Sequence, residues 1–249
     1  MKKVMSLMLG AGMAASIALA GGHGVHWGYS GEGAPAHWGD LSEDFVMCKM
    51  GKNQSPIDLR TDKAFETDLP AIVFSYHASS RDEVNNGHSV QVNIEPGSYI
   101  MIDGIKFELK QFHFHTPSEN TIDGKFFPME AHFVHVDEKG NIAVVALMFE
   151  YGEENGVLAR FWNGMPERAG DHRDISIPAE EIRKLFPKNR AYYRFNGSLT
   201  TPPCSEGVRW FVLKEPVTVS KKQVEQFARI MGEPNNRPVQ PINARVLLK

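Results

Sequence analysis

Hydrophobic runs long enough to cross a membrane are missing from this sequence. The best candidate, residues 4–17, carries no charge but falls short of the ~20 residues that a spanning helix needs. Two lysines precede it, and the Ala-Leu-Ala of residues 18–20 has the small-x-small pattern of a signal peptidase site. The sequence therefore predicts a signal peptide over residues 1–20, a mature chain over 21–249, and a periplasmic or secreted location.

Clusters of basic residues are absent too. The chain has 27 Lys and Arg against 30 Asp and Glu, a formal net charge of -3, and cleavage after Ala20 would remove two of the lysines. A surface for nucleic acid needs concentrated positive charge, so nucleic acid is not an expected partner. The sequence also predicts no membrane association once the leader is removed. Internal repeats are not found, and the length of 249 residues favours one larger domain.

Cysteine is scarce, with only Cys48 and Cys204 in the whole chain. Neither has another cysteine nearby, which argues against a zinc site built on thiolates. An exported protein enters an oxidising compartment, where an even pair more often forms a disulfide than two free thiols. The alternative is two buried thiols that lie far apart.

Strand patterns dominate the middle of the chain. Apolar and polar residues alternate where strands are expected, and Asp103-Gly104 is a dipeptide favoured in two-residue hairpin turns. A second turn, residues 137–140, separates two further strand patterns. The expected strands are 90–94, 99–102, 105–115, 129–136, 141–151 and 208–213.

Helices are expected to be few and short. Residues 179–185 are one candidate, and residues 221–231 are a better one. Ser220 and Gln223 have the spacing of a capping box before the second helix, and Gly232 follows as a stop signal. The sequence therefore predicts a mainly β, α+β domain with peripheral helices.

Three histidines have a spacing that suits a metal ion. Side chains alternate between the faces of a strand, so His113 and His115 point the same way. If strand 129–136 is the neighbour, His132 can complete a three-imidazole site with one open position. Neutral imidazoles suit catalytic zinc, whereas thiolates favour closed structural sites. On spacing alone, the alternative is that these are ordinary packed or surface histidines, and the reaction cannot be named.

Two polar residues support the metal interpretation. Gln111 and Glu130 each stand two residues before one of these histidines and on the same face of the strand. They are placed to accept the second ring N–H of a ligand, which is how metal-binding imidazoles are usually oriented.

Seven short motifs follow one another along the mature chain. They are His-Trp-Gly-Tyr at 26–29, Asn-Gln-Ser-Pro-Ile at 53–57, Asn-Asn-Gly-His at 85–88, Gln-Phe-His-Phe-His at 111–115, Glu-Ala-His-Phe-Val-His at 130–135, Gly-Ser-Leu-Thr-Thr-Pro-Pro at 197–203 and Asn-Arg-Pro-Val-Gln at 236–240. In this order the motifs resemble the α-class carbonic anhydrases, in particular the exported bacterial branch. The resemblance covers nearly all of the mature chain.

The resemblance implies reversible hydration of carbon dioxide to bicarbonate by a hydroxide on Zn²⁺, with the three histidines as zinc ligands. Thr200 is similar to the residue that accepts the hydroxide's proton in a hydrogen bond, and Glu119 to the carboxylate that receives the Thr200 proton. His88 is similar to the family's proton shuttle. Residues similar to the apolar carbon dioxide pocket are Val134, Val144, Leu199, Val208 and Trp210, and those similar to the water-ordering side are Tyr29, Asn86 and Gln91.

The resemblance also implies a twisted, mostly antiparallel sheet of about ten strands, and cis bonds at Ser55-Pro56 and Pro202-Pro203. A homodimer is suggested by analogy with exported relatives alone. Asn120 departs from the pattern, because many relatives have histidine there. Two other functions remain as alternatives: a secreted zinc hydrolase resembling an esterase, and a non-catalytic binding protein on the same fold.

Overall fold

The protein is described here by a computed structural model covering residues 25–249, so the predicted signal peptide lies outside the described residues. The helices are α1 (Trp38–Leu41), α2 (Met47–Met50), α3 (Gly156–Trp162), α4 (Ala179–Arg183) and α5 (Lys221–Met231), with short 3-10 turns at Gly31–Gly33 and Glu43–Phe45. The strands are β1 (Asp58–Leu59), β2 (Val73–Ser75), β3 (Ser80–Asn85), β4 (Val90–Ile94), β5 (Tyr99–Ile102), β6 (Ile105–His115), β7 (Thr121–Ile122), β8 (Met129–Val136), β9 (Ile142–Tyr151), β10 (His172–Asp174), β11 (Tyr192–Ser198), β12 (Glu206–Leu213) and β13 (Val217–Val219).

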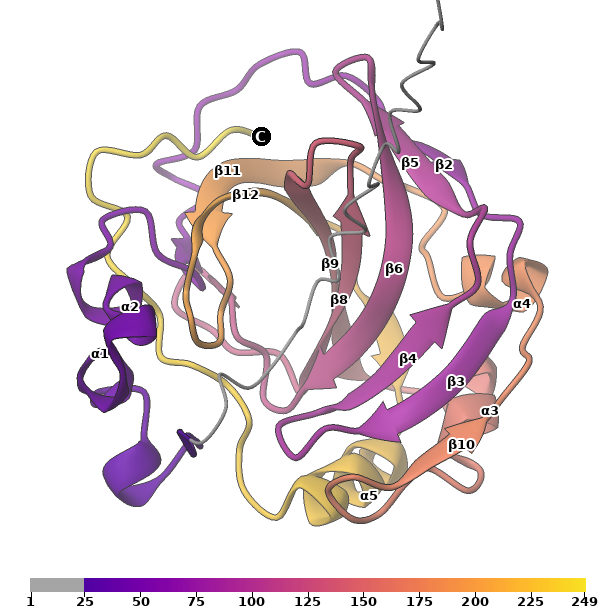
Figure 1. The fold of residues 1–249 in the computed structure, drawn as a ribbon. Helices are drawn as coiled ribbons and strands as arrows, with labels where there is room; N and C mark the ends of the chain where they lie inside the picture. The colour runs from indigo at the N-terminus through magenta and orange to yellow at the C-terminus, as the bar shows by residue number, and fades with distance from the viewer. Residues whose placement is uncertain (1–24) are drawn as a thin grey trace, which may run out of the picture.

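A curved sheet of 11 strands forms the body of the molecule (Figure 1). Its main path runs β10-β3-β4-β6-β8-β9-β12-β11, while β2 and β5 extend from β6, and β13 joins β9. Most neighbours are antiparallel, but β12 and β13 run parallel to β9. Helices α3 and α4 lie on the opposite side of the molecule from α1 and α2 (Figure 1). The predicted fold class is confirmed.

Local sequence signals account for several element boundaries. Asp103 and Gly104 have φ values of 53° and 73°, the positive values that a two-residue type I′ turn requires between β5 and β6. Strand β9 begins at Ile142 rather than at Asn141, because the Asn141 N–H donates to Asp137 Oδ1 in the preceding turn (2.8 Å). Helix α4 ends at Arg183, two residues before the predicted end, where the chain tightens into i,i+3 hydrogen bonds such as Leu185 N–H to Ile182 O (3.1 Å).

Helix α5 has the bounds and the capping box that the sequence predicts. The Ser220 hydroxyl accepts from the Gln223 N–H, and the Gln223 side chain accepts from the Ser220 N–H. Gly232 ends the helix with a φ of 75°. Residues 233–237, which follow this helix, form neither helix nor strand.

The two faces of β6 and β8 carry different chemistry. Phe112, Phe114 and Phe133 are buried in the main hydrophobic core, on the face that packs against α3 and α5. His113 and His132 point to the other face. His135 shares the core side with Phe133, as strand parity predicts, and its Nε2 lies 2.8 Å from the hydroxyl of Tyr76.

Burial of His135 predicts a pH-dependent stability. Desolvation lowers the pKa of His135 to about 3, although the carbonyl of Ala143 opposes the shift. An unfolded imidazole titrates near 6.5, so the unfolded chain takes up the proton first as the pH falls. This contribution to stability is complete above pH 6.5 and is lost at about 1.4 kcal/mol per pH unit down to pH 3.

Urea unfolding of wild type and His135→Gln from pH 7 to 4 measures this effect. We expect the free energy of unfolding of the variant to fall less steeply with decreasing pH than that of wild type. Equal slopes would contradict the assignment.

The N-terminal part of the described chain packs its aromatic residues inward. Trp27, Trp38 and Phe45 form a separate buried cluster with Cys204. Cys48 and Cys204 form a disulfide, which confirms that prediction. The bonds before Pro56 and Pro203 are cis, as the resemblance implies, and so is the bond before Pro117. Among residues 25–249, no helix has the length and apolarity needed to cross a membrane.

Candidate metal centre

His113, His115 and His132 converge on one point. Strands β6 and β8 are antiparallel neighbours, and His113 lies directly opposite His132 in their register. Each residue offers one ring nitrogen to the cluster, and these three nitrogens lie within 4.8 Å of one another. The condition set by the sequence, that the two strands be adjacent, is therefore met.

The second nitrogen of each ring faces an oxygen atom. His113 Nδ1 lies 2.8 Å from Gln111 Oε1, and His132 Nε2 lies 3.0 Å from Glu130 Oε1, as the spacing predicts. His115 Nδ1 donates instead to the backbone carbonyl of Asn235, at 2.6 Å. By elimination, Nε2 of His113, Nε2 of His115 and Nδ1 of His132 are left to face the shared point.

Burial keeps all three imidazoles neutral. Desolvation lowers the pKa of each ring, most strongly for His113 and His132, and the neighbouring histidines lower it further in those two rings. Neutral imidazole is the form that binds a metal ion. His115 Nε2 is buried and makes no hydrogen bond among the described residues. The site therefore carries a nitrogen lone pair without a partner, which a metal ion would satisfy.

Glu130 is a fully buried carboxylate held by several donors. Its Oε2 accepts from the backbone N–H groups of Glu119 (2.7 Å) and Asn120 (2.9 Å), and its Oε1 accepts from the Asn120 amide (2.7 Å). Burial raises the pKa of Glu130, while these hydrogen bonds lower it. Asn120, the departure from the family pattern, therefore holds the carboxylate that faces His132.

Glu119 lies beneath the histidines. Its Oε2 is 3.5 Å from His115 Nε2 and 3.8 Å from His132 Nδ1, and its Oε1 accepts from the backbone N–H of Arg237 at 2.9 Å. Burial raises the pKa of this carboxyl to about 8, against the lowering effects of the Arg237 N–H and of the Thr200 hydroxyl. Glu119 and Thr200 are therefore close enough to act on each other.

The end of β11 positions Thr200. Trp210 donates its indole N–H to Ser198 O (3.0 Å), and Ser198 exchanges hydrogen bonds with Ser55. The following loop closes on itself, because the Cys204 N–H donates to Thr201 O at 2.8 Å. Thr200 thus stands between a fixed strand end and the disulfide.

A cavity of about 180 Å³ opens above the three histidines. Its apolar lining includes Val134, Val144, Leu199 and Trp210, together with Ile142 and the two prolines of the 197–203 motif, which were not expected in the pocket. Val208 does not line this cavity. It is buried, with 2% of the residue exposed, in the cluster that contains Val144 and Trp210, and its role in the substrate pocket stays a prediction.

The expected polar residues Tyr29, Asn86, His88 and Gln91 also line the cavity. The ring of His88 stacks on Trp27, with ring centroids 3.5 Å apart and planes within 8°. Burial, together with the smaller effect of the charge of His26, lowers the pKa of His88 to about 4.

Sequence reasoning missed Asn235 as a partner of the site. Besides accepting from His115, this buried residue donates its amide to His88 O (2.9 Å) and Phe114 O (2.9 Å), and accepts from the Thr116 N–H (2.8 Å). Its position directly before the 236–240 motif is the only signal in the sequence. The fold and the site together define a mainly β protein with a three-histidine cluster, of a geometry that could hold a metal ion, in a largely apolar cavity.

Comparisons with known proteins agree with this class. A family model described as eukaryotic-type carbonic anhydrase matches residues 33–249. The chain is 49% identical over 224 residues to a carbonic anhydrase of Pectobacterium carotovorum, covering 90% of this chain and 91% of that one. A carbonic anhydrase of Neisseria gonorrhoeae is 49% identical, with 93% and 91% covered.

Solved structures give the same result. The α-carbonic anhydrase from Thermovibrio ammonificans, in complex with the inhibitor sulfanilamide, is 52% identical with a TM-score of 0.88, covering 91% of this chain and 100% of that chain. The chain belongs to the eukaryotic-type, or α, carbonic anhydrase family. Enzymes of this family hydrate carbon dioxide, and as a class they are zinc enzymes.

Proposed function

We propose that this protein catalyses the reversible hydration of carbon dioxide at a Zn²⁺ ion held by His113, His115 and His132. The observation that carries the proposal is the convergence of three neutral ring nitrogens within 4.8 Å, at the base of a cavity with an apolar wall. Carbon dioxide and bicarbonate are the small-molecule substrates that fit this cavity.

The residues present suit zinc better than other common ions. Three imidazole nitrogens and no thiolate at the site favour a catalytic zinc site with an open fourth position. Each ring is already oriented by Gln111, Asn235 or Glu130, so little freedom is lost when the ion binds. Zinc, when bound, supplies a Lewis acid that lowers the pKa of water to about 7, a value general to carbonic anhydrases.

Thr200 and Glu119 orient the reacting water. Glu119 is fixed by the N–H of Arg237, and the Thr200 hydroxyl is near enough to lower the pKa of Glu119, so this carboxylate is the proposed acceptor of the Thr200 proton. The Thr200 oxygen is then left as an acceptor, which directs one lone pair of the reacting oxygen toward the substrate. Val134, Val144 and Leu199 offer no hydrogen bonds, so they hold a linear, uncharged molecule beside that lone pair.

Stopped-flow measurement of carbon dioxide hydration tests the proposal. The purified mature protein is assayed as prepared, after treatment with a zinc chelator, and after zinc is added back. We expect activity that the chelator removes and zinc restores. A zinc-loaded protein with no hydration activity would overturn the proposal, as would full activity in metal-free protein.

His88 is the proposed proton shuttle at the cavity mouth. In the stack on Trp27 its pKa of about 4 makes it a weak base. Proton uptake therefore requires the ring to turn into water, where imidazole titrates near pH 6.5. Asn86 accepts from the backbone N–H of His88 (2.9 Å) and holds the turn while the side chain moves.

Replacing His88 by alanine should slow turnover most in dilute buffer. We expect kcat to fall by about a hundredfold at low buffer concentration, the lower end of general acid–base contributions, and added imidazole to restore it. His172→Ala, which changes an exposed histidine in β10, is the matched control and should behave as wild type. An equal loss for His88→Ala at every buffer concentration would refute the shuttle.

The leader and the disulfide together support export to the periplasm or the medium. Disulfides persist in such compartments, and Cys48–Cys204 joins segments 156 residues apart.

A further inference from the structure

Arg237 carries a buried, cationic side chain that the proposed mechanism does not use, although it uses the backbone N–H of the same residue. Its side chain is almost fully enclosed, with 1% of the residue exposed. No carboxylate among the described residues lies within 4.0 Å of its guanidinium, and burial lowers the pKa of the group to about 10. A buried charge without a paired charge is costly, so its retention calls for a role.

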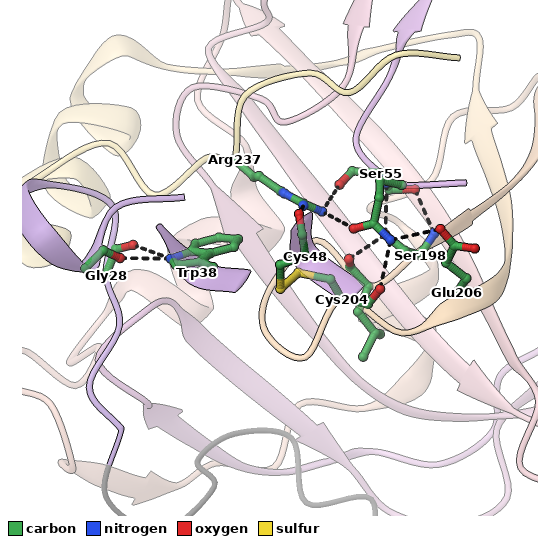
Figure 2. Close-up of a disulfide and its surroundings, with 11 residues drawn as sticks. Gly28, Trp38, Cys48, Ser55, Ser198, Cys204, Glu206 and Arg237 are labelled. Carbon is green, nitrogen blue, oxygen red and sulfur yellow. Dashed lines mark hydrogen bonds between the residues drawn. A yellow bond between two sulfur atoms is a disulfide. The ribbon is translucent and has the colours of Figure 1, made fainter. Parts of the chain in front are cut away.

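Neutral oxygens of the N-terminal segment hold the guanidinium in place (Figure 2). Its Nη1 donates to Gln54 Oε1 (2.9 Å) and to Ser55 O (2.8 Å), and its Nη2 donates to the backbone carbonyl of Cys48 (3.0 Å). The group also lies over the ring of Trp38, 5.6 Å from the ring centroid. The Arg237 side chain thus connects the C-terminal segment to residues 48–55, which begin at the disulfide-bonded Cys48.

The backbone of the same residue contacts the site. The Arg237 N–H donates to Glu119 Oε1 at 2.9 Å, while Glu119 Oε2 makes no hydrogen bond among the described residues. The orientation of this carboxylate therefore depends on where the backbone of residue 237 lies. Three side-chain hydrogen bonds of Arg237, all to the segment 48–55, anchor this residue.

We propose that Arg237 is a positioning residue: its guanidinium, anchored on Cys48, Gln54 and Ser55, holds its own backbone N–H against Glu119 and so keeps that carboxylate directed at Thr200. The inference rests on the proposed function, because Glu119 and Thr200 orient the reacting water there. A planar group with several fixed donors suits this task, whereas lysine presents a single point charge that cannot bridge the same three oxygens.

A double-mutant cycle separates positioning from general stabilisation. The variants are Arg237→Met, Arg237→Lys, Glu119→Gln and the combinations of each Arg237 change with Glu119→Gln. Arg245→Met is the matched control, because the Arg245 guanidinium is likewise held by neutral oxygens, the backbone carbonyls of Ile242, Asn196 and Pro241, and these partners lie outside the site. Each variant is assayed for kcat/KM of carbon dioxide hydration at low and high buffer concentration, for zinc content and for its melting temperature.

We expect Arg237→Met to lower kcat/KM by about tenfold to a hundredfold, the range typical of residues behind a metal site, with zinc retained. The loss should be the same at both buffer concentrations, since His88 is untouched. Arg237→Lys should recover part of it, and Arg245→Met should lose none. In the Glu119→Gln background, the Arg237 changes should cost little further, because coupled residues are not additive.

Two results would overturn the inference. The first is a multiplicative loss in the double variant, which would show that Arg237 acts independently of Glu119. The second is wild-type kcat/KM in Arg237→Met. If Arg237→Met fails to fold, the Arg237→Lys arm of the cycle decides in the same way. Absence of hydration activity in the zinc-loaded wild type would instead refute the proposed function, so the two failures are distinguishable.

Discussion

His132→Ala is expected to lose bound zinc and to lower kcat/KM for carbon dioxide by more than the roughly hundredfold effect of changes behind a metal site. The three rings form a triangle, with centroid distances of 5.4 Å from His132 to His113, 4.6 Å from His132 to His115 and 5.1 Å from His113 to His115. Two imidazoles cannot complete a tetrahedral site with one open position, and the buried carboxylate of Glu130 loses the ring that it faces.

Elemental analysis after dialysis and stopped-flow kinetics measure both parts of this prediction. His135→Gln is the matched control, because it changes a buried histidine of the same strand whose side chain faces the core rather than the cavity. The control should retain zinc and activity near wild type. A His132→Ala protein with a full equivalent of zinc and normal kinetics would show that the three-histidine centre is wrongly assigned.

Removing the disulfide should cause the largest loss of stability. The bond joins Cys48 to Cys204 across a sequence separation of 156 residues, so it restricts a very long loop in the unfolded chain. We expect the Cys48→Ala, Cys204→Ala double variant to lose roughly 2–5 kcal/mol in the free energy of unfolding. Alanine is preferred to serine, because Cys204 is fully buried and a hydroxyl there would lack a partner.

Chemical denaturation with and without a thiol reductant tests this second prediction. Reduced wild type should unfold at a lower denaturant concentration than oxidised wild type, close to that of the double variant, and the double variant should not respond to reductant. If oxidised and reduced wild type unfold at the same concentration, the disulfide contributes no stability.

Elements with strong periodicity could be predicted closely from the sequence. The bounds of β4, β5, β6, β8 and α5 agree with the alternating patterns, the Asp103-Gly104 turn and the capping box at Ser220. Strand β12 begins at Glu206, two residues before the predicted start. Polar Glu206 and flexible Gly207 hide this part of the strand, although its pairing with β11 continues to Ser198 across an irregularity in register.

The geometry of the site was likewise predictable only in part. That His113 and His115 share a face, and that Gln111 and Glu130 each stand beside a ligand, follows from the two-residue repeat of a strand. The adjacency of β6 and β8 does not follow from that repeat, since it depends on how the sheet is assembled. Val208 shows what parity leaves open: it shares a strand face with Trp210, but of the two only Trp210 lines the cavity.

By itself, the sequence determined the strand-rich class, the pairing of side chains on each strand face and the motifs that resemble one enzyme family. Only the tertiary structure decided which distant groups complete the site: Asn235 lies 120 residues from His115, and Arg237 lies 118 residues from Glu119. The physical reason is that backbone periodicity acts over a few residues. Backbone carbonyls are carried by every residue and backbone N–H groups by nearly every residue, so the contacts that they make do not produce a recognisable pattern in the amino-acid sequence.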